Sequence, residues 1–273
     1  LNILRQISMF GIVVVGYTMV MISGGCDMSV GGQLALCGMF AATLNVTYGL
    51  PTFVVVILTL MLGALFGLIN GLLMNVFNIM PLIVTLGTML FFQGASYIIS
   101  GGVAIFGLSD SFKFIGQGYL GFVPLPIVIL LVIGMLGYIV LHKTYFGRQI
   151  YAMGGNPEAA RLAGVNIKKY RLAVFTITGI LAAVAGIIMA ARTGSAQPSA
   201  GASYPFDCMT AVVLGGVSFA GGSGSMLGAM MGVIIIGVLN NGMQLIGMDS
   251  NMINCVKGIV LLIAIGIDSV QRT

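Results

Sequence analysis

Polar side chains that interrupt long apolar stretches are the first candidates for chemistry in this chain. Asp27 follows two glycines and precedes Ser29 and Gln33. A carboxylate at membrane depth costs roughly 2.5–3.5 kcal/mol on insertion scales, so it persists there only with hydrogen-bonding partners. Because DMSVGGQLAL has the pattern of a helix start, we interpret Asp27 as an N-cap in preference to a residue that contacts a solute.

Amide side chains form a second group. Asn240 and Gln244 are four residues apart and share a helix face, and Asn241 lies beside them. Amides in apolar surroundings either join helices or line an aqueous path, and the sequence leaves both interpretations open. The candidate lining of a translocation path is Asp27, Ser29, Gln33, Gln93, Asn240, Asn241 and Gln244. Gln93 is a weaker member of this set, as is Asn70.

Patterns typical of catalysis or metal binding are missing from the sequence. The four cysteines, Cys26, Cys37, Cys208 and Cys255, occur singly, and the lone His142 has no partner at metal-ligand spacing. No GxxxxGK[ST] motif occurs, so this chain cannot supply an ATPase of the Walker type. We therefore expect a protein that is not an enzyme, with no metal, no cofactor of its own and no nucleic-acid partner.

The motif GGNPEAARLAG spells a short polar helix with both ends marked. Asn156 is a good N-cap, Pro157 suits the first helical position, and Glu158, the only glutamate of the chain, faces the positive helix end. Arg161 can share a face with Glu158, and Gly164 suits the left-handed residue that ends a helix. A helix of about two turns is marginal alone in water, so the bundle, lipid headgroups or a partner must hold it.

The elements that position these residues are predicted to be membrane helices. Only 6% of residues are charged, against about 25% in ordinary soluble domains, and the mean hydropathy is +1.12. Continuous apolar runs exclude a transmembrane barrel, so the fold class is an all-α polytopic membrane protein with one transmembrane domain over residues 1–273. About nine membrane segments are expected, at 7–23, 31–49, 52–73, 81–99, 124–141, 172–191, 208–220, 226–247 and 253–270.

Glycines in these segments predict one helix break and two helix contact faces. The segment CMTAVVLGGVSFA is short and broken by Gly215 and Gly216, which predicts a half-helix or re-entrant piece. Small-xxx-small spacings predict helix contact faces at Gly63, Gly67 and Gly71 and at Gly224, Gly228 and Gly232. We expect the second face to join two copies of the chain.

The basic residues concentrate in one loop, which predicts the orientation. Residues 142–171 hold Lys143, Arg148, Arg161, Lys168, Lys169 and Arg171 against Glu158 alone, whereas the charges of the remaining chain cancel. The positive-inside rule places this loop in the cytoplasm. Counting crossings from it places Leu1, 101–123 and 192–206 outside and Arg272 inside.

Several long motifs carry a resemblance to a known family. YFGRQIYAMGGNPEAARLAGVNIKKYR resembles the cytoplasmic loop of ABC-importer permeases of the ribose/xylose/galactose type. ISGGCDMSVGG resembles the SGGxDLSVG signature of that family, with Met28 in place of the usual leucine. SAQPSAGASYPFDCMTAVVLGGVSFAGGSGSMLG and GVLNNGMQLIG are similar to its C-terminal half. The first membrane helix of the family, upstream of NILRQIS, is not present here.

The resemblance implies an ABC-importer permease fold with broken or re-entrant helices, and ten membrane segments in the complete protein. It implies the permease subunit of an ATP-driven, binding-protein-dependent importer for a monosaccharide or similar small polar solute. This subunit would lie in a bacterial inner membrane. The partners would be a cytoplasmic ABC ATPase subunit that carries ATP and Mg²⁺, an extracytoplasmic sugar-binding protein, a second permease copy or paralogue, and the lipid bilayer. The helix at 156–163 occupies the position of the coupling helix of the family, which assigns ATPase contact to Gly155, Asn156, Pro157, Glu158, Arg161, Leu162 and Gly164.

The alternative function is an ion- or proton-coupled secondary transporter. Such carriers need titratable groups inside the bundle and broken helices at the midplane. Only Asp27 and Asp207 are candidates for such groups, and Asp207 could instead pair with Lys257 near the same level. ATP dependence with a copurifying ATPase separates the two functions. The sequence leaves open which sugar is carried and whether the two permease copies are identical.

Overall fold

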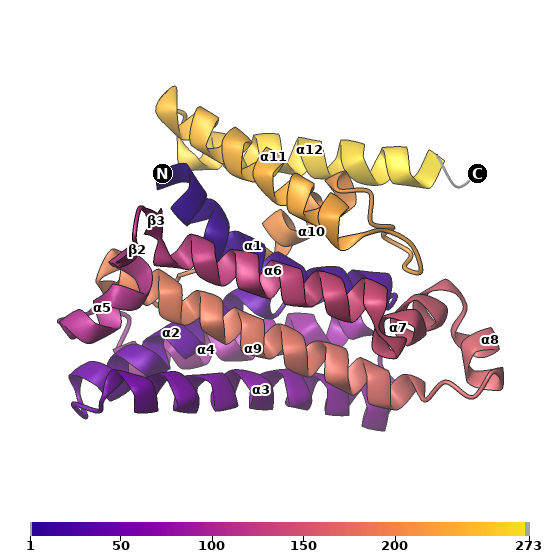
Figure 1. The fold of residues 1–273 in the computed structure, drawn as a ribbon, viewed down its shortest axis with the longest axis horizontal. Coiled ribbons are helices and arrows are strands. Elements are labelled where there is room, and N and C mark those ends of the chain that lie inside the picture. The colour runs from indigo at the N-terminus through magenta and orange to yellow at the C-terminus, as the bar shows by residue number, and fades with distance from the viewer. Residues whose placement is uncertain (1, 271–273) are drawn as a thin grey trace.

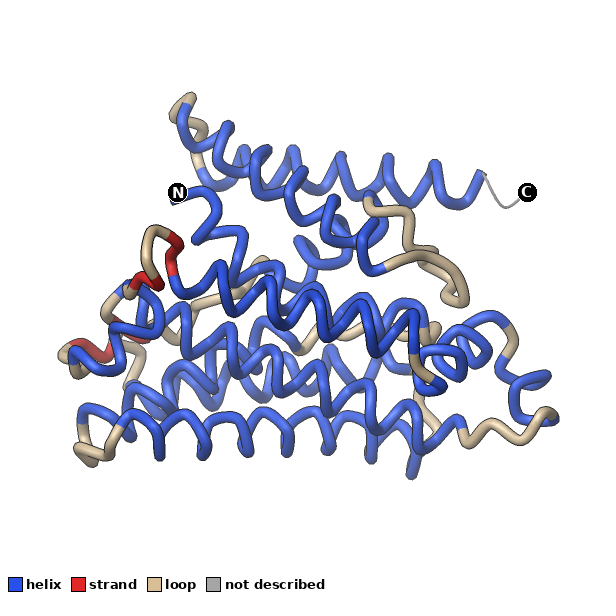
Figure 2. The backbone as a smooth tube through the Cα atoms, in the orientation of Figure 1, coloured by secondary structure: helices blue, strands red, loops and turns tan. Residues whose placement is uncertain are grey.

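The computed structural model describes residues 2–270, which are mostly helical (Figure 1, Figure 2). Among them, seven helices are long and apolar enough to cross a membrane. They are α1 (Asn2–Ile22), α3 (Thr52–Phe77), α4 (Pro81–Ser100), α6 (Leu125–Lys143), α9 (Ile167–Thr193), α11 (Met226–Leu245) and α12 (Ser250–Val270). The shortest has 19 residues, or about 28 Å at 1.5 Å per residue, close to the thickness of a hydrocarbon core.

Two shorter apolar helices, α2 (Val30–Val46) and α10 (Tyr204–Leu214), coincide with the other two expected segments. The count of nine crossings therefore stays a prediction. The expected extent of the seventh segment, 208–220, is wrong, because α10 begins earlier and stops before Gly215. Gly216 has a φ of +78°, a left-handed conformation that glycine adopts readily and that ends the helix.

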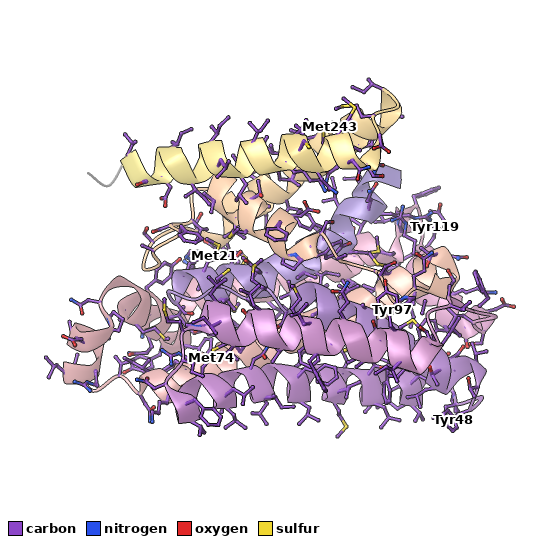
Figure 3. The ribbon with its side chains drawn as sticks, turned by 180° about the vertical axis from the view of Figure 1, so that it is seen from behind. Met21, Tyr48, Met74, Tyr97, Tyr119 and Met243 are labelled. Atoms are coloured by element: carbon purple, nitrogen blue, oxygen red, sulfur yellow. The ribbon has the colours of Figure 1, made fainter. Side chains whose placement is uncertain are left out.

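The centre of the bundle is α1, whose Val13, Val14 and Tyr17 have no exposed surface. The long α9 packs against α1, α2 and α3, while α11 and α12 both pack against α10 on one flank (Figure 1). Met21 and Met74 are buried inside, and Tyr48 projects at one end (Figure 3). A buried centre surrounded by apolar outer faces suits a bundle whose solvent is lipid.

The predicted glycine faces make contacts within the chain. A methyl group on Gly67 would overlap the carbonyl of Phe175, so α3 and α9 approach backbone to backbone. A methyl group on Gly232 would likewise overlap the carbonyl of Ala211 on α10. The expectation that Gly228 and Gly232 join two permease copies is therefore wrong, since both face α10 of the same chain.

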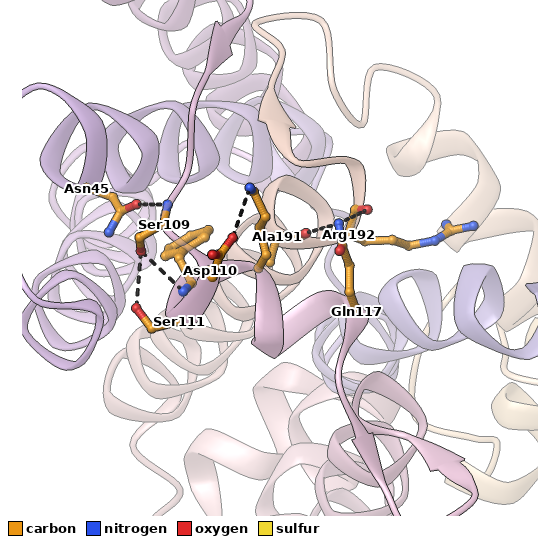
Figure 4. Close-up of polar contacts among 9 residues, drawn as sticks. Asn45, Ser109, Asp110, Ser111, Gln117, Ala191 and Arg192 are labelled. Atoms are coloured by element: carbon orange, nitrogen blue, oxygen red, sulfur yellow. Dashed lines mark hydrogen bonds and ion pairs between the residues drawn. The ribbon is translucent and has the colours of Figure 1, made fainter.

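Short elements gather at one end of the bundle, which we call the α5 end. Strand β1 (Ile105–Phe106) pairs with β4 (Ser195–Ala196), and β2 (Tyr119–Leu120) pairs with β3 (Val123–Pro124). Between them, α5 (Asp110–Gln117) is fixed by side-chain hydrogen bonds (Figure 4). Asn45 Oδ1 accepts from the Ser109 N–H at 2.8 Å, and Gln117 Nε2 donates to the carbonyls of Ala191 and Arg192.

Helices α7 (Tyr145–Gly155) and α8 (Pro157–Leu162) lie at the opposite end, which we call the α8 end (Figure 1). The segments after α4 and after α9 thus share the α5 end, and the basic loop lies away from them, as the predicted topology requires. The predicted positions of Leu1 and Arg272 fall outside the described residues.

Candidate functional site

The short helix α8 is capped as predicted. Asn156 Oδ1 accepts a hydrogen bond of 3.0 Å from the Ala159 N–H, and Pro157 is the first helical residue. Gly164 has a φ of +86°, which suits the left-handed residue after a helix. Glu158 and Arg161, both among the described residues, form no ion pair with each other. Capping, and not charge pairing, fixes this helix.

The outer surface of α8 is free. All seven residues predicted to contact the ATPase are exposed: Gly155, Asn156, Pro157, Glu158, Arg161, Leu162 and Gly164. Leu162 is 85% exposed, while Ala160 is the residue of α8 that is buried. The helix extends beyond the bundle (Figure 1), so a partner can reach its full outer face.

Beneath α8, three segments that are distant in sequence meet at glycines. The Gly222 N–H donates a hydrogen bond of 2.9 Å to the carbonyl of Ile22, the last residue of α1. A methyl group on Gly154 would overlap that same carbonyl, and one on Gly221 would lie 2.7 Å from the Gly24 Cα. We call this contact the glycine junction, formed by Gly24, Gly154, Gly155, Gly221 and Gly222.

Side chains of α6 and α7 contact the start of α11 and the segment before it. The Tyr151 hydroxyl donates to the Gly224 carbonyl at 2.7 Å, and His142 Nε2 accepts from the Met226 N–H at 3.1 Å. Helix α7 is therefore joined directly to the segment that connects α10 with α11. The sequence does not predict this junction, because the glycine pairs are visible in it but their approach in space is not.

A second group of polar residues forms a cluster around Ser29, in which no member has exposed surface. The Ser29 hydroxyl donates to Asp27 Oδ1 at 2.5 Å and accepts from Gln33 Nε2 at 2.7 Å and from Asn70 Nδ2 at 2.8 Å. The Ser29 cluster, defined as Asp27, Ser29, Gln33 and Asn70, thus joins the α1–α2 connection to α3. In the described conformation it holds helices together.

The expected N-cap role of Asp27 is wrong. Helix α2 begins at Val30, with Ser29 as its flanking residue, and Asp27 Oδ1 accepts from the Ser29 N–H at 2.9 Å. Asp27 therefore closes the turn before the helix. Its second oxygen, together with Gln33 Oε1 and Asn70 Oδ1, has no hydrogen-bond partner in the part of the chain that the structure describes.

The amides of α11 lie in a different place. Asn240 and Gln244 line a cavity of about 160 Å³ between α1, α10, α11 and α12, here called the α10–α12 cavity. Its polar lining consists of Gln6, Ser203, Asp207, Asn240, Gln244 and Lys257. Asn241 does not line this cavity, and Gln93 is half-buried against the irregular segment at Pro198. The structure therefore divides the predicted path residues among separate sites.

An ion pair crosses the α10–α12 cavity. Lys257 Nζ lies 2.9 Å from Asp207 Oδ1 and 3.0 Å from Oδ2, and Ser203 Oγ donates to Oδ2 at 2.9 Å. Both charged side chains are largely buried, so their pairing offsets the cost of removing them from water. The sequence indicated this pair only as an option. No sequence pattern predicted that Ser203 would bond Asp207 or that Gln6 would line the cavity. No group of three potential metal-ligating side chains occurs among the residues described.

The apolar helices, the buried polar groups and the exposed capped helix together define a polytopic membrane transport subunit. The chain belongs to the family described as "Branched-chain amino acid transport system / permease component", whose model matches residues 1–265. It is accordingly a permease component and not an enzyme.

Curated relatives cover nearly the whole chain. The ribose import permease protein RbsC of Bacillus subtilis (strain 168) is 42% identical over 98% of this chain and 84% of its own length. RbsC of Escherichia coli (strain K12) is 40% identical over 99% of this chain and 85% of its own length. The xylose transport system permease protein XylH of the same strain is 35% identical over 99% of this chain and 84% of its own length. No solved structure matches the chain.

Proposed function

We propose that this chain is the permease subunit of an ATP-driven, binding-protein-dependent importer for a pentose or similar monosaccharide. The names of the relatives favour a sugar over an amino acid, because the proteins that share about 40% of its residues import ribose. The basic loop with α8 would lie in the cytoplasm of a bacterium, and the α5 end outside. We further propose that this chain has nine membrane segments, some of them broken, and that it works together with a second permease copy.

The observation that carries the coupling role is the combination of exposure and attachment at α8. Its outer face is free, yet its base is joined to α1 and to the segment before α11 through the glycine junction. A cap at Asn156 keeps so short a helix ordered. These are the properties that a helix needs if an ATPase subunit is to move the bundle through it.

A specific observation also supports the alternative of ion coupling. Asp27 is a fully buried carboxyl group, and one of its oxygens has no partner among the described residues. A proton relay would need such a group. A proton-coupled carrier would work without an ATPase and would lose transport when the proton gradient collapses.

Reconstitution in proteoliposomes tests the proposal. The protein is purified with the ATPase and binding protein encoded beside it, and uptake of labelled ribose, xylose and leucine is measured with and without internal ATP. We expect sugar uptake that requires ATP and the binding protein and persists with a protonophore present. Uptake abolished by the protonophore and independent of ATP would establish the secondary transporter, and uptake of leucine alone would overturn the sugar assignment.

A further inference from the structure

The α10–α12 cavity is placed where a solute entering at the α5 end would meet it. Helices α1 and α12 begin, and α11 ends, near that end of the bundle (Figure 1). Its lining comes from Gln6 on α1, the start of α10, the last third of α11 and Lys257 on α12. At about 160 Å³, it is smaller than the roughly 300–1,000 Å³ of sites for drug-sized ligands. Only a small solute fits it.

The charges of the cavity cancel. Asp207 and Lys257 hold each other at 2.9 Å, so the pair adds no net charge to the space between the helices. The ammonium group has three N–H donors, and its recorded contacts in the described chain are with the Asp207 carboxylate. Such a wall offers a donor and acceptors without selecting for an ion, which favours a neutral hydrogen-bonding solute.

An unpartnered acceptor belongs to one of the residues that line the cavity. Asn240 Oδ1 is buried and lacks a hydrogen-bond partner among the described residues. Buried polar atoms are nearly always paired, so an orphan beside a polar cavity indicates a missing donor. Gln6, Ser203 and Gln244 add further amide and hydroxyl groups around it. A molecule that carries several hydroxyl groups would supply the donor that Asn240 lacks.

Two aromatic rings form an apolar part of the wall. Phe10 and Tyr204 both line the cavity, with ring centroids 5.9 Å apart at an interplanar angle of 81°. A lining that combines hydrogen-bonding groups with aromatic rings matches a small sugar, which has hydroxyl edges and C–H faces.

We propose that the α10–α12 cavity is a subsite for a neutral polyhydroxylated solute, with Asn240 and the Asp207–Lys257 pair as its hydrogen-bonding groups. This inference rests on the proposed function and adds where the sugar pauses within one permease subunit. The hydroxyl groups of the solute donate to Asn240 Oδ1 and accept from Lys257 Nζ. The pairing of Lys257 with Asp207 keeps the ammonium in place when the subsite is empty.

Uptake kinetics of the complete transporter test the subsite, with labelled ribose as the probe. Asn240→Leu keeps the size of the side chain but removes both hydrogen-bonding groups, and we expect its KM to rise about tenfold, as loss of a buried hydrogen bond predicts. Gln244→Leu changes an exposed side chain at the rim, so folding is retained, and a smaller rise in KM is expected. The matched control is Asn251→Leu, an exposed position of α12 outside the cavity.

Copurification of the ATPase measures assembly of each variant, so misfolding is separated from a loss of affinity. An unchanged KM in assembled Asn240→Leu and Gln244→Leu shows that the cavity holds only water, and the subsite is then wrong although the transporter function stands. A parent protein that carries neither ribose nor xylose refutes the proposed function, and the subsite with it. A higher KM in the two cavity variants and not in the control establishes the subsite.

Discussion

Gly222 and Ile22, 200 positions apart in the chain by their numbers, are joined by a backbone hydrogen bond of 2.9 Å at the base of α8. Gly154 lies so close to the same Ile22 carbonyl that a Cβ atom at this position would overlap it. The end of α1, the end of α7 and the segment before α11 therefore form one contact. Under the proposed coupling role, this contact would carry a displacement of α8 to α1 and to the segment before α11.

Gly154→Ala is expected to open the glycine junction. The added methyl group would overlap the Ile22 carbonyl, and overpacking of this kind costs typically 1–3 kcal/mol. We expect a lower unfolding temperature in detergent and a loss of sugar-stimulated ATP hydrolysis. Gly94→Ala on α4 is the control, because a methyl group there meets no atom within 4 Å. Equal behaviour of the two variants would show that the junction is not tightly packed.

Removal of the Asn156 cap should weaken the ATPase contact without unfolding the bundle. Asn156→Ala removes the acceptor for the Ala159 N–H, a loss of about 1 kcal/mol, which corresponds to about fivefold in affinity for the ATPase. Asn156→Asp retains an acceptor and should bind like the parent. Affinity is measured by titration of the ATPase onto the purified permease in nanodiscs.

A break in α8 should have a larger effect than loss of its cap. Ala160→Pro removes the N–H that bonds the Asn156 carbonyl at 2.9 Å, at a cost of about 3 kcal/mol in helix stability. We expect a folded membrane bundle that no longer copurifies with the ATPase. Normal ATPase binding and transport by this variant would falsify the coupling role of α8.

Asp27→Asn distinguishes a structural carboxyl group from a proton relay. The amide keeps an acceptor for the Ser29 N–H and removes the cost of a buried charge, so thermal stability should be equal to or above that of the parent. Asp27→Leu leaves the Ser29 groups unpaired and should lower stability by about 1–3 kcal/mol. If Asp27→Asn folds but cannot transport, this result supports the proton-relay alternative and contradicts the ATP-driven proposal.

Removal of one member of the Asp207–Lys257 pair should lower folding stability more than removal of both members. Lys257→Met leaves a buried carboxylate uncompensated and is expected to cost about 3–5 kcal/mol, whereas Asp207→Leu with Lys257→Met should restore most of that loss. Thermal unfolding of the single and double variants measures the difference. Asp110→Ala, which breaks an exposed pair with Lys113, is the control and should change stability little. A double variant no more stable than Lys257→Met would contradict this account.

Much of this protein is determined by its sequence alone. Composition requires a polytopic helical membrane protein, and the letters NPEAARLAG predict α8 and its cap, because a cap is a hydrogen bond between residues three apart. The net positive charge of residues 142–171 is likewise counted directly from the sequence. The limits of α10 and the position of Asp27 before α2 were predicted less well, because turns compete with helix starts for the same polar residues.

Tertiary structure alone decides which distant groups meet. Asn70 reaches Ser29 across 41 positions, and Lys257 reaches Asp207 across 50. Gly232 of α11 contacts Ala211 of α10, and Gly228 contacts Gly215 just after it. Each outcome depends on the depth and rotation of whole helices, which are set by the summed packing of many apolar side chains. Those side chains resemble one another in composition, so the sequence pattern shows that helices pack but not which faces meet.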